Sequence, residues 1–155
     1  MGHFNAFPLV LQPGPVTHGS FAWFRRPPGE LFAQLRGLGT DPQQTIIQVN
    51  HPRDSVRGYF NAFNTGTYTG APLPDKGPFS LDRSPNADGS PGPYDFRQFS
   101  LDFDALEIFN GKRMRTGALA LRDWFLLLNK GYAFTAVGGA GSRTVVTQER
   151  GYPRT

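Results

Sequence analysis

Histidine is the side chain best suited to acid–base or metal chemistry near neutral pH, and this 155-residue chain contains three of them. His51 stands in the run Asn-His-Pro-Arg, at the carboxyl end of a β-branched segment over 45–50. Because the following proline restricts His51 to an extended backbone, we expect its imidazole to be held at a strand end. There it could bind a metal ion or transfer a proton, or it could be a hydrogen-bonded structural histidine. His3 precedes an apolar segment and has no such context by itself, and His18 lies in a Gly/Pro loop where we expect it to be solvated.

Other chemically useful groups are few, and no catalytic residue can be assigned from them. The chain has no cysteine, so any metal must be held by His, Asp, Glu or backbone oxygen. Asp102 and Asp104 could form an acid–base pair, but they lie at the beginning of a predicted strand, and we expect them at the surface. The run from Ser84 to Asp95 partly imitates a calcium loop, yet it begins with Ser and contains prolines, which is typical of a solvated loop.

The elements that must position these groups follow from composition and hydrophobic spacing. We expect a single domain over 1–155, because 38% hydrophobic residues supply one modest core, whereas 19 Gly and 14 Pro exclude a long-helix bundle. The patterns predict strands at 4–11, 45–50, 101–110 and 133–137, and helices at 30–38 and 118–130, the second capped by Thr116 and ended by Gly131. A Gly/Pro-rich excursion occupies about 64–100. Strands that alternate with helices indicate an α/β fold.

Charge and hydropathy narrow the classes of partner. The formal net charge of +4 favours small anionic ligands, but the arginines are spread over the whole chain rather than gathered on one element, which argues against a nucleic-acid-binding protein. No apolar run approaches the roughly 20 residues of a membrane span. The first residues lack the features of a signal peptide, which leaves the cytoplasm as the default compartment.

Five motifs follow one another along nearly the whole chain. They are GHFNAFPL from Gly2, NHPR from Asn50, FDALEIFNG from Phe103, DW and LNKG within 123–131, and GYPRT from Gly151. In this order they resemble the PHP superfamily of metal-dependent hydrolases, and within it the CehA/McbA-like branch. The resemblance implies a distorted (β/α)7 barrel whose strand ends gather two or three divalent metal ions, which activate water to hydrolyse phosphoesters or related esters.

The resemblance also implies roles for particular residues. His3 and His51 match two metal ligands, and neutral imidazoles at adjacent strand ends can hold zinc, manganese or iron. Arg53 could orient an anionic group of a small ester substrate, or it could pair with a nearby carboxylate. Glu107 is interpreted as a buried acceptor behind the site rather than as a ligand.

Departures from the family pattern predict an incomplete or impaired site. The family carries a His-x-His strand before the motif that contains His3, and a Ser-Asp-x-His signature where this chain has Gly141 and Arg143. We therefore expect a partial barrel, truncated at both ends. Such a barrel exposes sheet edges, so the chain could be a fragment, a homo-oligomer or an adapted remnant.

Two classes of function stay open on these grounds. The first is an enzyme, a PHP-type hydrolase represented by a partial chain. The second is a non-catalytic PHP-like domain in which Arg143 supplies a fixed positive charge to an anionic ligand. A calcium- or nucleic-acid-binding surface protein is the third and least supported class.

Overall fold

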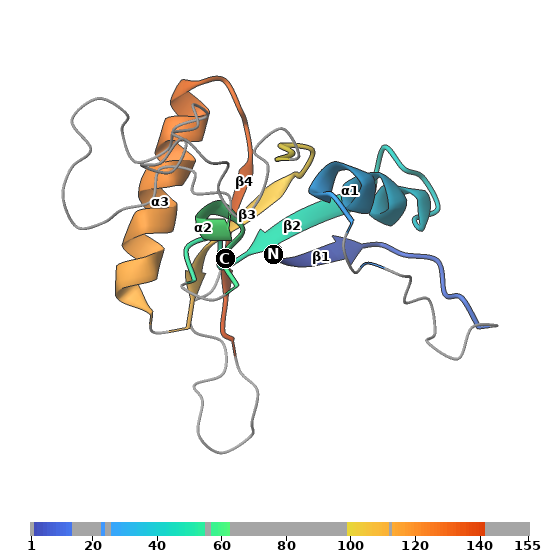
Figure 1. Cartoon of the computed structure of the whole chain (residues 1–155), viewed down its shortest axis with the longest axis horizontal. Coiled ribbons are helices and arrows are strands. Elements are labelled where there is room, and N and C mark those ends of the chain that lie inside the picture. The colour runs from blue at the N-terminus through green and yellow to red at the C-terminus, as the bar shows by residue number, and fades with distance from the viewer. Residues whose placement is uncertain are drawn as a thin grey trace, which may run out of the picture.

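The fold is α/β and is built around one mixed sheet of four strands (Figure 1). The computed structural model describes residues 2–13, 23, 26–54, 57–62, 99–111 and 113–141. The strands are β1 (His3–Phe7), β2 (Ile46–Asn50), β3 (Ala105–Asn110) and β4 (Thr135–Gly139), in the spatial order β1-β2-β3-β4. β1 is antiparallel to β2, whereas β2, β3 and β4 are parallel. Within the described residues this sheet is open.

In the described part of the chain three helices accompany the sheet: α1 (Pro28–Gly37), α2 (Tyr59–Ala62) and α3 (Met114–Asn129). Figure 1 shows α3 alongside β3 and β4, with α1 at the opposite end of the sheet, near the beginning of β2. The core is rich in aromatic rings, which pack in edge-to-face, tilted and stacked pairs. The ring centroid of Phe32 in α1, for example, lies 5.0 Å from that of Phe4 and 6.5 Å from that of Phe103, both edge to face. None of the described helices is long and apolar enough to cross a membrane.

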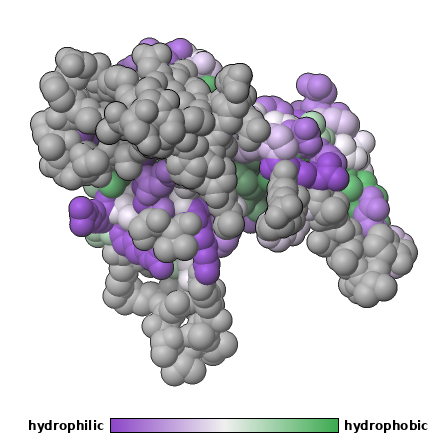
Figure 2. Space-filling model, viewed as in Figure 1, coloured by the Kyte–Doolittle hydropathy of each residue, from purple (hydrophilic) through white to green (hydrophobic). Residues whose placement is uncertain are grey.

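Every predicted strand and helix is present, but the boundaries differ. β1 ends at Phe7 instead of 11, because Pro8 has no N–H for the ladder and Leu9–Leu11 turn outward. Figure 2 shows apolar residues at the surface near this end of β1. β3 begins at Ala105 instead of 101, because the carboxylate of Asp104 accepts the Ile47 N–H in place of a backbone carbonyl.

One of the two sequence signals predicted for the ends of α3 is confirmed and the other is wrong. α3 starts at Met114, and the Thr116 hydroxyl donates to the Arg113 carbonyl at 3.0 Å, so the prediction that Thr116 caps the helix is wrong. The prediction that Gly131 ends it is confirmed, since its φ of +89° is the left-handed conformation that glycine adopts most readily. β4 extends to Gly139, two residues beyond its predicted end. Most of the predicted excursion over 64–100 lies outside the described residues.

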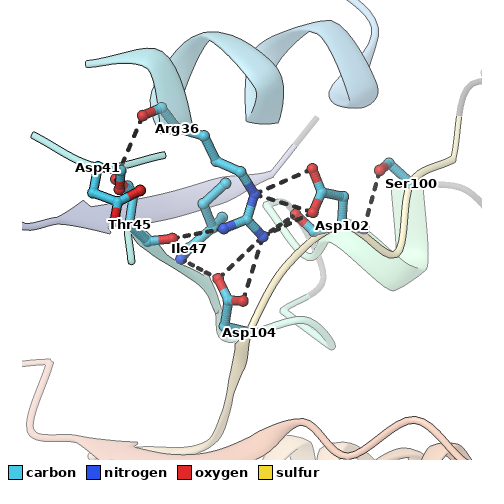
Figure 3. A network of polar contacts seen from close by, with 7 residues as sticks. All are labelled: Arg36, Asp41, Thr45, Ile47, Ser100, Asp102 and Asp104. Carbon is cyan, nitrogen blue, oxygen red and sulfur yellow. Dashed lines mark hydrogen bonds and ion pairs between the residues drawn. The ribbon is translucent and has the colours of Figure 1, made fainter. Parts of the chain in front are cut away.

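A polar cluster joins α1 to the sheet at the edge where β2 begins (Figure 3). The Arg36 guanidinium binds the Asp102 carboxylate at 2.8 Å, the Asp104 carboxylate at 3.2 Å and the Thr45 carbonyl at 2.6 Å. Asp102 and Asp104 are both more than 40% exposed. They are therefore partners of Arg36, at the edge opposite the carboxyl ends of the parallel strands, and do not form an acid–base pair.

Candidate functional site

The side chains of His3 and His51 meet at the carboxyl edge of the parallel strands. Nδ1 of His3 lies 3.2 Å from Nε2 of His51, and the two rings pack edge to face with their centroids 4.9 Å apart. Both side chains are half-buried. The two histidines that the resemblance implied as ligands are thus brought together, although 48 positions separate them in the chain.

Strand direction explains why they meet. His3 is the first residue of β1, and His51 follows the last residue of β2. Because β1 runs antiparallel to β2, the register pairs His3 with Asn50, so the beginning of one strand lies beside the end of the other. A parallel first strand would have placed His3 at the opposite edge of the sheet.

The backbone of His51 is not extended as Pro52 predicted. Its φ is +29°, in the left-handed region, which costs a non-glycine residue about 1–3 kcal/mol. Hydrogen bonds on both sides of the residue hold this conformation. The His51 N–H donates to Oε2 of Glu107 at 2.6 Å, and the His51 carbonyl accepts the N–H of Asp54 at 2.9 Å. Tertiary contacts therefore override the local preference.

Glu107 is a buried carboxylate at the back of the site. It is 5% exposed, and its second oxygen, Oε1, accepts a hydrogen bond from Nδ2 of Asn110 at 2.9 Å. Gly139 on the neighbouring strand makes room for it, because a Cβ at that position would overlap Oε1. Since both oxygens accept protein hydrogen bonds, Glu107 supports the His51 backbone in this structure; its place relative to a metal ion stays a prediction.

Arg53 takes the second of its two predicted roles and pairs with a carboxylate. Its Nε and Nη2 bind the two oxygens of Asp123 on α3, the latter at 2.9 Å, and its Nη1 donates to Oδ1 of Asn61 at 3.1 Å. The two side chains of the ion pair are 2% and 1% exposed. Burial raises the pKa of Asp123 to about 6, while the hydrogen bonds from Arg53 oppose the rise. A guanidinium held in this way faces the protein interior.

Asp123 is the member of this region that sequence reasoning missed as a functional group. It entered only as one letter of a motif, yet it lies on the buried face of α3 with Ala120 and Leu127. An acidic residue at helical spacing among buried apolar residues is the signal that could have identified it, because a buried charge requires a partner. Arg143 and His18, and the calcium-like run, lie outside the described residues.

The separation of the two imidazole nitrogens is that of a hydrogen bond between the rings, and it also matches two ligand positions of one metal ion. Two imidazole nitrogens bound at about 2.0–2.1 Å to a tetrahedral zinc ion are roughly 3.3 Å apart, and the observed separation is 3.2 Å. Within the described ranges no group of three or more His, Asp or Glu side chains is placed to hold a metal ion. Among the described residues Nδ1 of His51 is buried without a hydrogen-bond partner, whereas a metal-binding histidine usually donates its second N–H to an acceptor. These residues thus supply part of a site.

Comparisons of the chain with protein-family models, with curated proteins and with solved structures found no match. The likeness to the PHP superfamily therefore stays a prediction from the five motifs.

Proposed function

We propose that this chain is a PHP-like metal-dependent hydrolase domain with an incomplete site, in which His3 and His51 hold one divalent cation. The observation that carries the proposal is the approach of the two imidazole nitrogens to 3.2 Å at the carboxyl edge of the sheet. That edge is where α/β enzymes with parallel strands collect their functional residues.

The open sheet is compatible with this proposal. β1 and β4 are its edges in the described part of the chain, and each could be continued by further strands. On this proposal the four strands are a segment of the distorted (β/α)7 barrel that the motifs imply. The antiparallel β1 is part of that distortion, and it is what places His3 beside His51.

The proposed hydrolytic chemistry depends on a metal ion bound by the two imidazole nitrogens. Zinc, manganese or iron bound here would lower the pKa of a bound water, which is what hydrolysis of a phosphoester or a related small anionic ester requires. In the chain itself the two imidazoles face each other, and Glu107 fixes the backbone of His51. Because a proton and a metal ion compete for the same imidazole nitrogen, the affinity for the metal should fall as the pH is lowered.

The site would need additional ligands for full activity. The family pattern places carboxylate and imidazole ligands where this chain has Gly141 and Arg143. Gly141 has a φ of +62°, and a Cβ there would lie 2.8 Å from Oδ1 of Asn110. Restoring the pattern with Gly141→Asp and Arg143→His should strengthen metal binding, although the aspartate must displace the Asn110 amide.

The test is the metal content and affinity of the purified, tag-free chain for Mn²⁺ and Zn²⁺, by elemental analysis and calorimetry. We expect about one metal ion per chain, lost in His3→Ala and in His51→Ala but retained in the control His18→Ala. Retention of metal in all three variants would refute the assignment. Absence of metal from the wild type would refute the hydrolase proposal, and binding of inorganic phosphate would then favour the non-catalytic domain for anionic ligands.

A further inference from the structure

The geometry points to a positioning role for Arg53 and Asp123. We propose that this buried ion pair anchors the turn His51–Asp54 to α3 and so holds the His51 imidazole against His3. The inference rests on the proposed function, because it concerns the same histidine pair. It assigns a role to two residues whose side chains are buried in the protein interior.

Arg53 and Asp123 form a bidentate ion pair that is buried from solvent. Nε and Nη2 of Arg53 bind the two carboxylate oxygens of Asp123, with both side chains at most 2% exposed. The guanidinium also lies 5.5 Å from the centre of the Phe60 ring. A planar guanidinium bound at two nitrogens and packed on a ring can neither rotate nor translate freely, so its main chain is fixed relative to α3.

The link from Arg53 back to His51 is short and stiff. Only Pro52 lies between them, and its ring fixes φ near −65°. The Pro52 carbonyl accepts the Phe60 N–H at 3.1 Å, which ties the same segment to α2. Nδ2 of Asn61 donates to the carbonyls of Arg53 and Asp54, both at 3.1 Å. A change in the position of Arg53 must therefore be transmitted to His51.

His51 is held from both directions as a result. Glu107 binds its N–H from β3, and the anchored turn binds its carbonyl. These contacts are needed because the left-handed backbone at a residue before proline is intrinsically unfavourable. If one support is removed, His51 can relax toward the extended backbone, and its ring then leaves the position opposite His3.

Stability alone is a poor explanation of the pair. A buried ion pair often contributes less to stability than apolar side chains of similar volume, because both charges must be desolvated. Two apolar residues could link the turn to α3 with similar packing. What they could not supply is a directional, bidentate hydrogen bond that fixes the orientation of the turn.

The first experiment compares Asp123→Asn with the wild type by two readouts. Since the chain has three histidines, a long-range ¹H–¹⁵N spectrum contains three sets of imidazole signals, and His18→Ala assigns one of them. We expect the His3 and His51 signals to shift in Asp123→Asn without added metal. We also expect the affinity for Zn²⁺ to fall roughly 10- to 100-fold, the usual effect of losing a group that orients a ligand.

The matched control is Asp102→Asn, which weakens an exposed Arg–Asp pair at the opposite edge of the sheet. It should leave both readouts unchanged. If Asp123→Asn does not fold, the double variant Arg53→Met/Asp123→Leu keeps an apolar contact and should show the same shifts and the same loss of affinity. Wild-type imidazole signals in the folded variant would overturn the inference. If the wild-type chain itself binds no Zn²⁺, the proposed function fails, while the imidazole spectra still decide whether the ion pair positions His51.

Discussion

Acidification from pH 7 to pH 4 should stabilise the wild-type protein relative to the variant Asp123→Asn. Burial raises the pKa of Asp123 from 3.8 to about 6 in the folded state. Between these values the folded protein binds a proton at Asp123 more readily than the unfolded chain does. The contribution of this group to the free energy of unfolding is therefore fully present below pH 4 and is lost as the pH rises through 6.

The magnitude follows from the size of the shift. A rise from 3.8 to about 6, at 1.36 kcal/mol per pKa unit, corresponds to about 3 kcal/mol in total, of which about 2 kcal/mol falls between pH 7 and pH 4. Other carboxylates change the absolute stability over the same interval. The quantity to follow is therefore the difference between the wild type and Asp123→Asn, which lacks the titrating group.

Urea unfolding followed by circular dichroism at half-unit pH steps measures this difference. The free energy of unfolding usually falls by about 1–3 kcal/mol per molar urea. The urea midpoint of the wild type minus that of Asp123→Asn should therefore be about 1 M greater at pH 4 than at pH 7. Parallel stability curves would show that Asp123 titrates normally in the folded protein. A difference that grows with rising pH would show that the ion pair with Arg53 outweighs burial, which would reverse the reasoning.

Substitutions of Glu107, Gly139 and Tyr59 test the packing around the site and the core. Glu107→Leu should lower the free energy of unfolding by at least about 2 kcal/mol, because the His51 N–H and Nδ2 of Asn110 lose their acceptor. Glu107→Gln should lower it less, and equal losses in the two variants would contradict the acceptor role. Gly139→Ala should cost about 1–3 kcal/mol, because the methyl group would overlap the Glu107 carboxylate, while Gly37→Ala, with open space at its Cβ, should be neutral or stabilising. Tyr59→Phe should cost about 1–2 kcal/mol in thermal or urea unfolding, because its buried hydroxyl exchanges two hydrogen bonds with the backbone of residue 100; wild-type stability would show that water replaces them.

Local patterns in the sequence predicted which elements form. Hydrophobic spacing located α1 and α3, and Gly131 marked the end of α3 because a left-handed residue is needed there. β-branched residues located β2, and the α/β class followed from the alternation of strands with helices. Such signals are carried by neighbouring residues, so one sequence suffices to detect them.

Boundaries were predicted less well where a distant group replaces a local one. β3 begins late because the Asp104 carboxylate takes a hydrogen bond from Ile47, which is 57 positions away. His51 departs from the backbone that Pro52 favours because Glu107 binds its N–H. In both cases a tertiary hydrogen bond outweighs a local preference of a few kcal/mol or less.

In the candidate site, too, some features were predictable from the sequence and others were decided by tertiary contacts. The sequence by itself placed His51 at a strand end and excluded cysteine chemistry, whereas the roles expected of His3 and Glu107 came from the resemblance to a family. The meeting of the two histidines was decided by the antiparallel pairing of β1 with β2, and the partner of Arg53 was decided by packing of α3 against the turn, 70 positions away. Residue type and spacing specify burial and local conformation, whereas contacts between distant segments depend on strand direction and helix packing, which exist only once the chain has folded.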